Sequence, residues 1–562
     1  MPSHPHRPTG FDRRRFMIGM GVAAATLPSV VRAAAAPDAI FTHGVASGDP
    51  LSDRVILWTR INPALGQRVQ INWEVALDDG FTRLLRRGRV LALATNDHTV
   101  KVDARGLPAG ATLYYRFSTT TGQRSATGRT RTLPVGTLDT LKLAVFSCSN
   151  YPAGFFHAYA EASRMDDVFA AVHLGDYIYE YARDGYASED AATLGRESLP
   201  DSELITLAHY RERYAQYRSD PDLQALHAAM PWICVWDDHE ISNDTWKDGA
   251  ENHDSATEGD FALRRAAAIK AYHEWLPIRP PQADRWQRIY RSFTFGSLVD
   301  LHMLDTRVIG RDLQLDYASY FGATGFDAAR FGADMANPHR QLLGTEQQQW
   351  LSQQMAAGQA TWTLLGQQVL MGRMNIPAPL VLGQISFGAY SQLLFKAQTN
   401  PGALTAAEQA ILAQPAIPYN LDAWDGYAVA RETLLGTARA LQKNLVVLAG
   451  DTHNAWASDL QDLQGRQVGV EFATPGVSSP GLEAYFPNEN PTAVAAGLSQ
   501  IIGPLVYADT ANRGFMVVTA TPHECRCDWH FVSSVKTSSY STWLGQSLKT
   551  LPGAGQRKLI SA

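Results

Sequence analysis

The chain has 562 residues, which corresponds to about two to five domains at the usual domain size. Apolar residues make up 45% of it, aromatic residues 10% and charged residues 19%, a composition that excludes intrinsic disorder, collagen and a coiled coil. Lys and Arg total 49 against 55 for Asp and Glu, a net charge of −6. Because no basic excess is available to neutralise a phosphate backbone, we expect no nucleic-acid scaffold role.

The first 35 residues have the charged, apolar and small-residue zones of an export signal: Asp12-Arg13-Arg14-Arg15-Phe16-Met17, the run 17–31, and Ala33-Ala34-Ala35. The paired arginines resemble a twin-arginine signal, so we expect residues 1–35 to be cleaved after the twin-arginine translocase exports a periplasmic or secreted protein. A membrane anchor is the alternative, but spanning needs about 20 strongly apolar residues, and this run is short and rich in Gly and Ala. Cleavage would remove five arginines and one aspartate, which leaves a net charge of −10.

Short alternating segments separated by turn residues predict an all-β sandwich over residues 38–135. The expected strands are 55–58, 69–75, 99–102 and 113–117. In the last of these Leu113, Tyr115 and Phe117 share one face after a Pro/Gly turn, much as in fibronectin type III domains. A Thr/Gly/Pro/Asp cluster near residues 134–139 predicts the domain boundary.

Residues 140–562 show a different pattern, in which apolar runs without polar alternation are separated by stretches with helical periodicity. The runs predict buried central strands of an α/β domain at 143–146, 170–174, 232–236, 298–304, 362–365 and 445–449. Two stretches, 310–340 and 373–426, read as insertions that shape a pocket. The polar tail from about residue 534 is expected to hold one helix, and the sequence leaves open whether that helix packs elsewhere or covers the site. Four cysteines are too few for a disulfide framework.

Each of the six runs is followed directly by polar residues that can bind a ligand: 147–150, 175–179, 237–240, 305–307, 366–368 and 450–454. Ligands bind at the carboxyl ends of strands in open α/β sheets, so six such ends predict a site. Asp176, Asp238, Asp451 and His453 offer the oxygen and imidazole donors that suit two neighbouring cations. Two cations about 4 Å apart activate water for phosphoryl displacement without a covalent nucleophile.

Several segments, taken in order along the chain, resemble the PhoD-type alkaline phosphatases, a branch of the metallophosphoesterases. They are 41–50, 55–60, 147–149, 173–180, 236–244, 305–307, 366–368, 424–427, 450–453 and 474–480. The resemblance implies a multidomain α+β protein in which the N-terminal sandwich precedes an α/β domain with two facing sheets flanked by helices. It also implies an iron–calcium centre (Fe³⁺ and Ca²⁺), with Zn²⁺ or Mn²⁺ as the alternative.

The resemblance further implies roles for individual residues. Asp176 would bridge the two cations, with Cys148, Tyr179 and His453 on the iron. The calcium donors would be Asp176, Asp238 and Asp451, with Asn243 in reach if its loop turns back. A buried structural thiol is the alternative for Cys148, and packing beside other tyrosines is the alternative for Tyr179.

The catalytic candidates beyond Asp176 follow from the same segments. His239 would contact the phosphate or protonate the leaving group. Arg307, Gln368 and Asn150 are weaker candidates for contacts to phosphate oxygens, since an Arg after a strand is more often a surface or salt-bridge residue. Asp254-Ser255-Ala256 mimics the nucleophile of serine-type alkaline phosphatases but lacks suitably spaced zinc ligands.

We therefore expect an exported, monomeric alkaline phosphatase that hydrolyses small phosphate monoesters, and possibly diesters, with a metal-activated hydroxide. Phosphodiesterase or phospholipase D-like activity on phospholipids is the first alternative, and it would require an apolar approach surface. A non-catalytic, metal-stabilised binding protein is the second, although a scaffold has no need for six polar strand ends.

Overall fold

A computed structural model describes residues 40–281, 285–323 and 325–562. The predicted signal peptide lies outside the described residues, and its export role stays a prediction. Within the described ranges, no helix combines the length and the apolarity that crossing a bilayer requires. All four cysteines are buried and free, in agreement with the expectation from their number.

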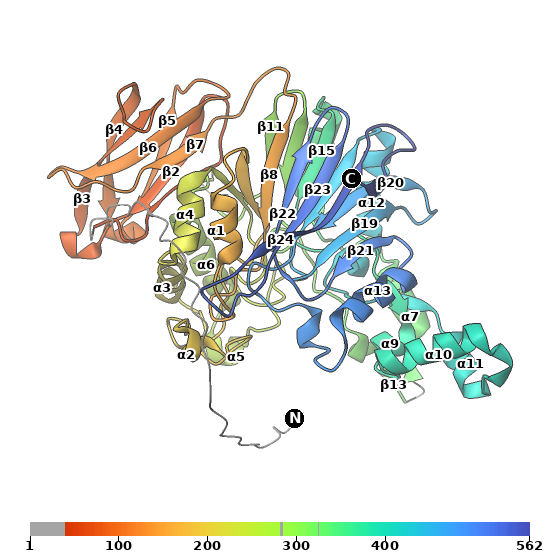
Figure 1. Ribbon diagram of the computed structural model, residues 1–562. Coiled ribbons are helices and arrows are strands. Elements are labelled where there is room, and N and C mark those ends of the chain that lie inside the picture. Colours follow the sequence, from red (N-terminus) through yellow and green to blue (C-terminus); the bar gives the residue numbers. More distant parts are fainter. Residues whose placement is uncertain (1–39, 282–284, 324) are drawn as a thin grey trace, which may run out of the picture. The chain divides into compact units, whose positions relative to one another are not determined.

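The strands of the described residues form three larger sheets and two small two-stranded sheets (Figure 1). In spatial order, the ten-stranded sheet contains β25 (Ile560–Ser561), β24 (Thr542–Thr550), β23 (Cys525–Val532), β22 (Arg513–Ala520), β8 (Leu141–Phe146), β9 (Ala170–His173), β10 (Trp232–Cys234), β1 (Val45–Gly48), β2 (Arg54–Arg60) and β5 (Thr99–Arg105). The seven-stranded sheet contains β11 (Arg291–Phe295), β12 (Val299–Met303), β15 (Trp362–Gly366), β18 (Leu445–Ala449), β20 (Gln467–Ala473), β19 (Ala455–Gln461) and β21 (Leu505–Asp509). The four-stranded sheet contains β4 (Leu84–Leu93), β3 (Arg68–Ala76), β6 (Thr112–Thr119) and β7 (Gly128–Arg131).

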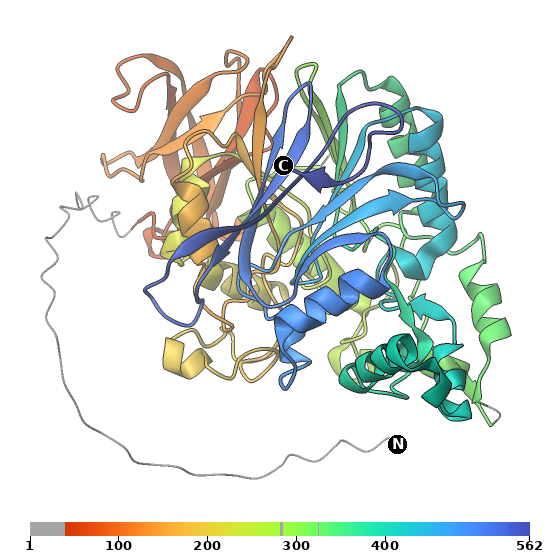
Figure 2. The same cartoon turned by 45° about the vertical axis from the view of Figure 1, so that its right-hand side comes forward.

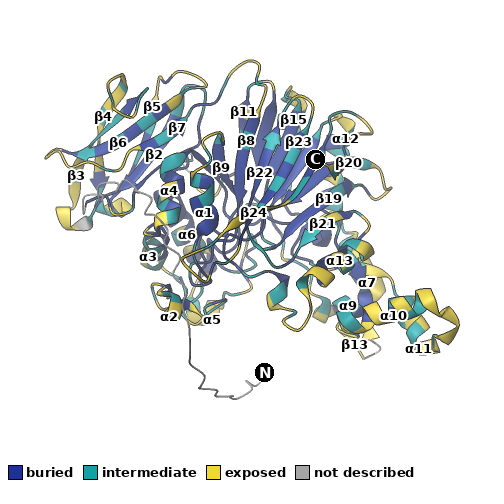
Figure 3. Cartoon of the chain, viewed as in Figure 1, coloured by how far each residue is buried: buried dark blue, intermediate teal, exposed yellow. Residues whose placement is uncertain are grey.

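The two larger sheets face each other across a shared core, as expected. Along β18, Val446 and Leu448 join the core that includes β8 and β9, whereas Leu445, Val447 and Ala449 pack toward the helices on the opposite side. Both faces of the strand are buried, which explains why its sequence shows no polar alternation. Figure 3 shows the same burial across both sheets.

Helices flank the two sheets. Those that cover the ten-stranded sheet are α1 (His157–Ser163), α3 (Leu207–Tyr217), α4 (Pro221–Ala229) and α6 (Phe261–Trp275). Those that cover the seven-stranded sheet are α8 (Gly344–Ala357), α12 (Ala428–Ala440) and α13 (Pro491–Ile501). Two short helices, α2 (Ala191–Leu194) and α5 (Ser255–Glu258), lie in loops.

The two stretches predicted as insertions carry their own small elements. The first contains the hairpin β13 (Phe321–Gly322) and β14 (Gly325–Phe326) and helix α7 (Ala328–Met335). The second contains β16 (Asn375–Pro377), paired with β17 (Ala416–Pro418), and helices α9 (Ala378–Val381), α10 (Phe387–Thr399) and α11 (Ala406–Leu412). In Figure 3 α10 and α11 expose many residues, while α9 lies closer to the body of the structure.

The N-terminal β region is a sandwich, but it does not have two sheets of its own. Leu113, Tyr115 and Phe117 on β6 are all buried on one face, as predicted. They pack against β1, β2 and β5, which form the end of the ten-stranded sheet. The described residues accordingly belong to a single compact unit, and the two-domain division stays a prediction.

Gly48 joins the sandwich to the rest of the ten-stranded sheet, since β1 and β10 pair through Gly48 and Trp232. A Cβ at Gly48 would lie 2.4 Å from the Pro277 carbonyl oxygen and 2.6 Å from that of Trp232. We expect Gly48→Ala to lower the free energy of unfolding by about 2–3 kcal/mol, because backbone must shift to relieve the overlap. Urea denaturation measures this.

Gly436 is the matched control, because it lies inside α12 and a Cβ there meets nothing within 4 Å. Gly436→Ala should raise the stability by about 0.5–1 kcal/mol through helix propensity. Equal effects of the two substitutions would contradict the close-packing account of Gly48.

The tail expectation was wrong in its secondary structure. Residues 542–550 form β24, which pairs with β23 along its length, and Ile560–Ser561 form the edge strand β25. Thr542 to Leu544 are exposed, and the buried Leu548 and Thr550 come only at the end of the strand. Because the alternation of apolar and polar residues is weak, the sequence shows little sign of this strand. Hydrogen bonding to β23 stabilises β24.

Candidate functional site

The predicted site residues follow the carboxyl ends of strands from both facing sheets. In the ten-stranded sheet β8, β9 and β10 run parallel and lead into Cys148, Asp176 and Asp238. In the seven-stranded sheet β12, β15 and β18 also run parallel, and β18 leads into Asp451 and His453. Ligand-capable loops that are far apart in the sequence therefore meet at one edge of the two sheets.

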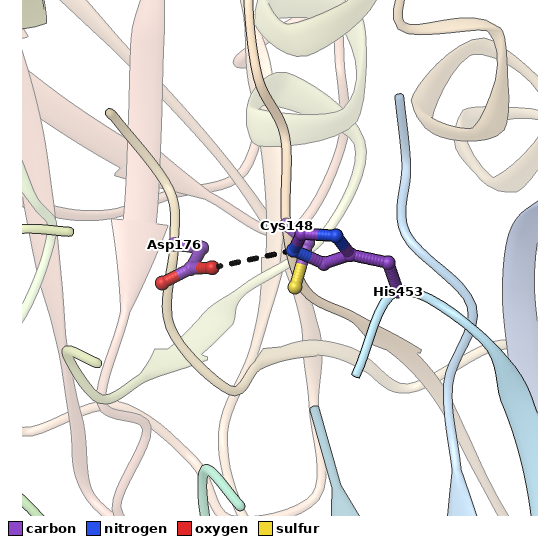
Figure 4. Close-up of side chains that lie close together, drawn as sticks. All are labelled: Cys148, Asp176 and His453. Atoms are coloured by element: carbon purple, nitrogen blue, oxygen red, sulfur yellow. Dashed lines mark ion pairs between the residues drawn. The ribbon is translucent and has the colours of Figure 1, made fainter. Parts of the chain in front are cut away.

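Cys148, Asp176 and His453 form the first donor cluster, with their ligand atoms all within 4.8 Å of one another. Figure 4 shows the three side chains converging, with His453 Nε2 4.0 Å from Asp176 Oδ2. Tyr179 completes the group, since its hydroxyl donates to Asp176 Oδ2 (2.9 Å) and lies 3.2 Å from His453 Nε2. The structure thus brings together all four residues predicted to hold iron.

The tautomer of His453 is fixed by its surroundings. Nδ1 lies 2.8 Å from the carbonyl oxygen of Pro480, an atom that only accepts, so Nδ1 carries the proton. The lone pair of Nε2 is left facing Asp176 and Tyr179, as a metal ligand requires. Ser479 donates to the Tyr179 hydroxyl (2.7 Å) and fixes that ring on its other side.

Four candidate ligands have a left-handed backbone: Cys148 (φ 60°), Asp176 (φ 55°), Asp451 (φ 63°) and His453 (φ 59°). Residues with a Cβ adopt this region at a cost of about 1 kcal/mol or more each, and such strain concentrates at functional sites. The left-handed backbone at these four positions turns each side chain toward the donor clusters within a few residues of the end of its strand.

A second set of carboxylates adjoins the first. Asp176, Asp238 and His239 form one group with ligand atoms within 4.8 Å, and Asp237, Asp238 and Asp451 form another. Burial, together with neighbouring carboxylates, raises the pKa of Asp451 to about 8 despite Arg307. Burial also holds the pKa of Asp237 well above its usual range. The carboxylates outnumber the positive groups around them, and bound cations would supply the missing positive charge.

The donors fit a pair of cations. Asp176 belongs to both clusters, and its Oδ1 is buried with no hydrogen-bond partner among the described residues. A buried carboxylate oxygen without a partner is costly unless it binds a cation. Thiolate, phenolate and imidazole on one side suit a trivalent iron, and carboxylates on the other suit a hard divalent ion.

Arg307 is fully buried among acidic side chains. Its guanidinium donates to Asp237, to Asp422 (2.7 Å) and to Asp451 (3.2 Å), and it lies 3.7 Å from Asp238. The N–H groups of Arg307 thus face carboxylates, and its positive charge holds these carboxylates in position. A contact between Arg307 and phosphate stays a prediction. Sequence reasoning missed Asp422, which also binds Arg311, because it lies in an insertion and two residues before the segment 424–427 that carries the resemblance.

Three other predicted residues use their side chains elsewhere. Gln368 ties strand ends together, donating to Trp236 and Leu304 carbonyls and accepting from Thr306. The Asn243 side-chain NH₂ donates to Glu251 (2.8 Å), and a role of its oxygen as a calcium ligand stays a prediction. Asn150 donates to the Tyr186 carbonyl (3.1 Å), and its Oδ1 is buried without a partner in the described structure.

Two glutamates that were not predicted position the predicted residues. Glu240 accepts from the backbone N–H groups of Asp176 (3.0 Å), Tyr177 and Asp237 (2.7 Å), which fixes the loop that carries the shared ligand. Glu180 contacts His239 Nδ1 at 2.8 Å and accepts from the Asn243 N–H. Both glutamates lie in sequence segments that we singled out for other residues. Their burial would have pointed to them, and the sequence does not show it.

The protonation state of His239 is set by the acidic side chains around it. Burial alone would lower its pKa, but the carboxylates of Asp238, Glu180 and Asp176 outweigh burial and hold the pKa well above the usual range. The ring also stacks on Tyr179, with 4.2 Å between centroids. An imidazolium beside the donor clusters is suited to protonate a leaving oxygen.

We expect Glu180→Gln to lower kcat by about 10–100-fold, because residues that orient a site side chain have effects of this size. Steady-state turnover of an aryl phosphate measures the loss, and thermal unfolding checks the fold. Glu189→Gln, at an exposed position, is the matched control. A kcat equal to that of the control would show that Glu180 does not position His239.

The serine-phosphatase mimic is excluded as a site by its surroundings. Ser255 is exposed at the start of the short helix α5, where Asp254 caps the helix by accepting from the Ala256 N–H (2.9 Å). Neither residue belongs to a metal-binding group among the described residues.

Asp451 and His453 line a cavity of about 170 Å³ that connects the site with its surroundings. Its walls include the aromatic side chains of Tyr419, Trp456 and Tyr485.

Comparisons with known proteins identify the family of the chain. Residues 143–529 match the family of PhoD-like phosphatases, and residues 24–134 match the PhoD-like phosphatase N-terminal domain. Alkaline phosphatase D of Bacillus subtilis (strain 168) is 35% identical over 559 residues, which cover 93% of this chain and 85% of that protein. A solved structure described as "Structure of PhoD" superimposes with a TM-score of 0.75 at 32% identity, covering 93% of this chain and 92% of the other. The chain belongs to the PhoD-like phosphatase family.

Proposed function

We propose that this phosphatase is an exported, metal-dependent alkaline phosphatase that hydrolyses phosphate monoesters. The observation that carries the proposal is the position of Asp176, which belongs to two adjoining donor clusters and keeps one buried oxygen unpaired among the described residues. A carboxylate shared in this way is the expected centre of a two-cation site. The non-catalytic alternative has no support in the family matches.

Cys148, Asp176, Tyr179 and His453 would hold Fe³⁺, and Asp176, Asp238 and Asp451 would hold Ca²⁺. Zn²⁺ or Mn²⁺ is the alternative pair. When bound, the cations supply the positive charge that activates water and neutralises the phosphoryl oxygens.

The chain's own residues then orient the reaction. The His239 imidazolium donates its proton to the leaving oxygen, while Glu180 holds Nδ1 at 2.8 Å. Arg307 holds Asp237, Asp422 and Asp451 in place from inside the protein. Burial of these groups excludes bulk water, which strengthens each electrostatic contact.

Export by the twin-arginine route to the periplasm or medium, as a monomer, is part of the proposal. The paired arginines Arg13 and Arg14 before an apolar run support it. A route that carries folded proteins also suits a chain whose cations are loaded before export.

Elemental analysis and the visible spectrum of the purified protein test the metal assignment. We expect about one iron per chain and a charge-transfer band, both lost in Tyr179→Phe or Cys148→Ser. Zinc without iron or colour would replace the iron assignment, and no bound metal would overturn metal dependence.

Turnover of 4-nitrophenyl phosphate against bis(4-nitrophenyl) phosphate, with and without chelator, tests the reaction. We expect faster turnover of the monoester and loss of both activities with chelator. Preference for the diester would overturn monoester specificity while leaving the phosphatase family assignment intact.

A further inference from the structure

An apolar chamber of about 280 Å³ lies beside the candidate site, with Ile376, Val381, Phe387, Phe486, Leu498 and Ile502 in its walls. Ser386 and Glu489 are polar members of the same lining. Ligand pockets in proteins have this character, apolar walls with few polar groups. Nothing in the proposed hydrolysis uses this chamber.

The chamber adjoins the cavity at the candidate site. Met374, Tyr419, Trp456 and Leu482 line both, so these four side chains form a common wall. The smaller cavity reaches Asp451 and His453. The chamber therefore lies next to the space that the ester group of a substrate would enter when its phosphoryl group is at the donor clusters.

The chamber is built by segments that are far apart in the sequence. Residues from β16, α9 and the start of α10 form one side, and residues of α13 form the other, with the insertion and α13 close together in Figures 1 and 2. The Phe387 ring lies against Gly497 of α13, where an added Cβ would come within 2.7 Å of it. The Tyr419 N–H donates to the Met374 carbonyl (2.8 Å), which fixes the common wall.

We propose that the chamber binds the apolar ester group of the substrate, so that alkyl phosphates with a chain of several carbons are preferred over short ones. This inference rests on the proposed phosphatase function and adds the substrate class. In the reaction, a water oxygen bonds to phosphorus, the bond from phosphorus to the alkyl oxygen breaks, and the alcohol leaves with a proton. The chamber contributes by removing the chain from water.

Phosphate release from methyl, butyl and octyl phosphate tests the proposal with the full-length enzyme. Their alkoxide leaving groups have closely similar basicity, so differences in kcat/KM report binding of the chain. Since each buried methylene contributes about fourfold, octyl phosphate should exceed methyl phosphate by at least about 30-fold. Equal kcat/KM values for the three esters, or turnover of 4-nitrophenyl phosphate without release from any of them, would overturn the proposal. No phosphate release from 4-nitrophenyl phosphate either would overturn the proposed monoesterase function.

Phe387→Gln and Phe395→Gln provide a matched pair on α10. Phe387 lines the chamber, whereas Phe395 is 67% exposed on the same helix. The octyl-to-methyl ratio should fall at least about fivefold in the first variant, which loses apolar wall, and stay unchanged in the second. Leu498→Gln, on the opposite wall, should repeat the fall. A ratio that is retained in both chamber variants would place the chain-binding site elsewhere.

Discussion

Asp176→Asn should reduce kcat/KM for an aryl phosphate by about 1,000-fold or more, since the loss of several kcal/mol of charge stabilisation has this effect. The substitution removes a negative charge that both donor clusters share and replaces one oxygen with an NH₂ group that cannot bind a cation. Because Oδ2 receives the Tyr179 hydroxyl, the position of that phenol is disturbed as well. Metal content should fall together with activity.

Asp184→Asn is the control, because Asp184 is an exposed aspartate in the loop that follows Asp176. It should keep full activity and metal content. Steady-state kinetics and elemental analysis on both variants separate the outcomes, with thermal unfolding as the check on folding. An Asp176→Asn enzyme that keeps its metals and more than a tenth of its activity would show that Asp176 is not the shared ligand.

Arg307→Met should have the largest effect on stability, a loss of about 3–5 kcal/mol in the free energy of unfolding, because it leaves buried carboxylates without their counter-charge. The guanidinium is fully buried and contacts Asp237, Asp422 and Asp451. These contacts, rather than burial, hold the pKa of Arg307 well above its usual range.

Arg105→Met is the comparison, since its ion pair with Asp103 is at the surface, with 67% of the Arg105 side chain exposed. An exposed pair contributes about 0–1 kcal/mol. Urea denaturation of the two variants, each with and without chelator, measures the difference. A loss below about 1 kcal/mol for Arg307→Met would contradict the counter-charge role.

The double variant Arg307→Met/Asp422→Asn tests the counter-charge role of Arg307 by also removing one of its carboxylate partners. Asp422 also binds Arg311, so it keeps one cation when Arg307 is removed. The loss in the double variant should be smaller than the sum of the two single losses, because Asp422 and Arg307 contact each other directly. An additive further loss would show that Arg307 acts through packing alone.

The sequence by itself determined the six buried strands that lead into the candidate site. The β18 run predicts a strand buried on both faces, and the structure places its side chains alternately in two cores. Local patterns sufficed for these strands because consecutive residues show whether one face or both faces are buried. The family resemblance, and not a local pattern, pointed to Cys148 and Tyr179 as partners of Asp176 and His453, and the structure brings the four side chains together.

Only the tertiary structure decided which polar residues face the centre and which support it. Gln368 follows its predicted strand almost as closely as Asp238 does, yet its side chain bonds to neighbouring strand ends. Glu240 and Asp422 gave no local signal, because their partners lie in other loops or across the two sheets. The physical reason is that a side chain's direction after a strand depends on left-handed backbone turns and on contacts between distant segments, which residue order along one strand does not specify.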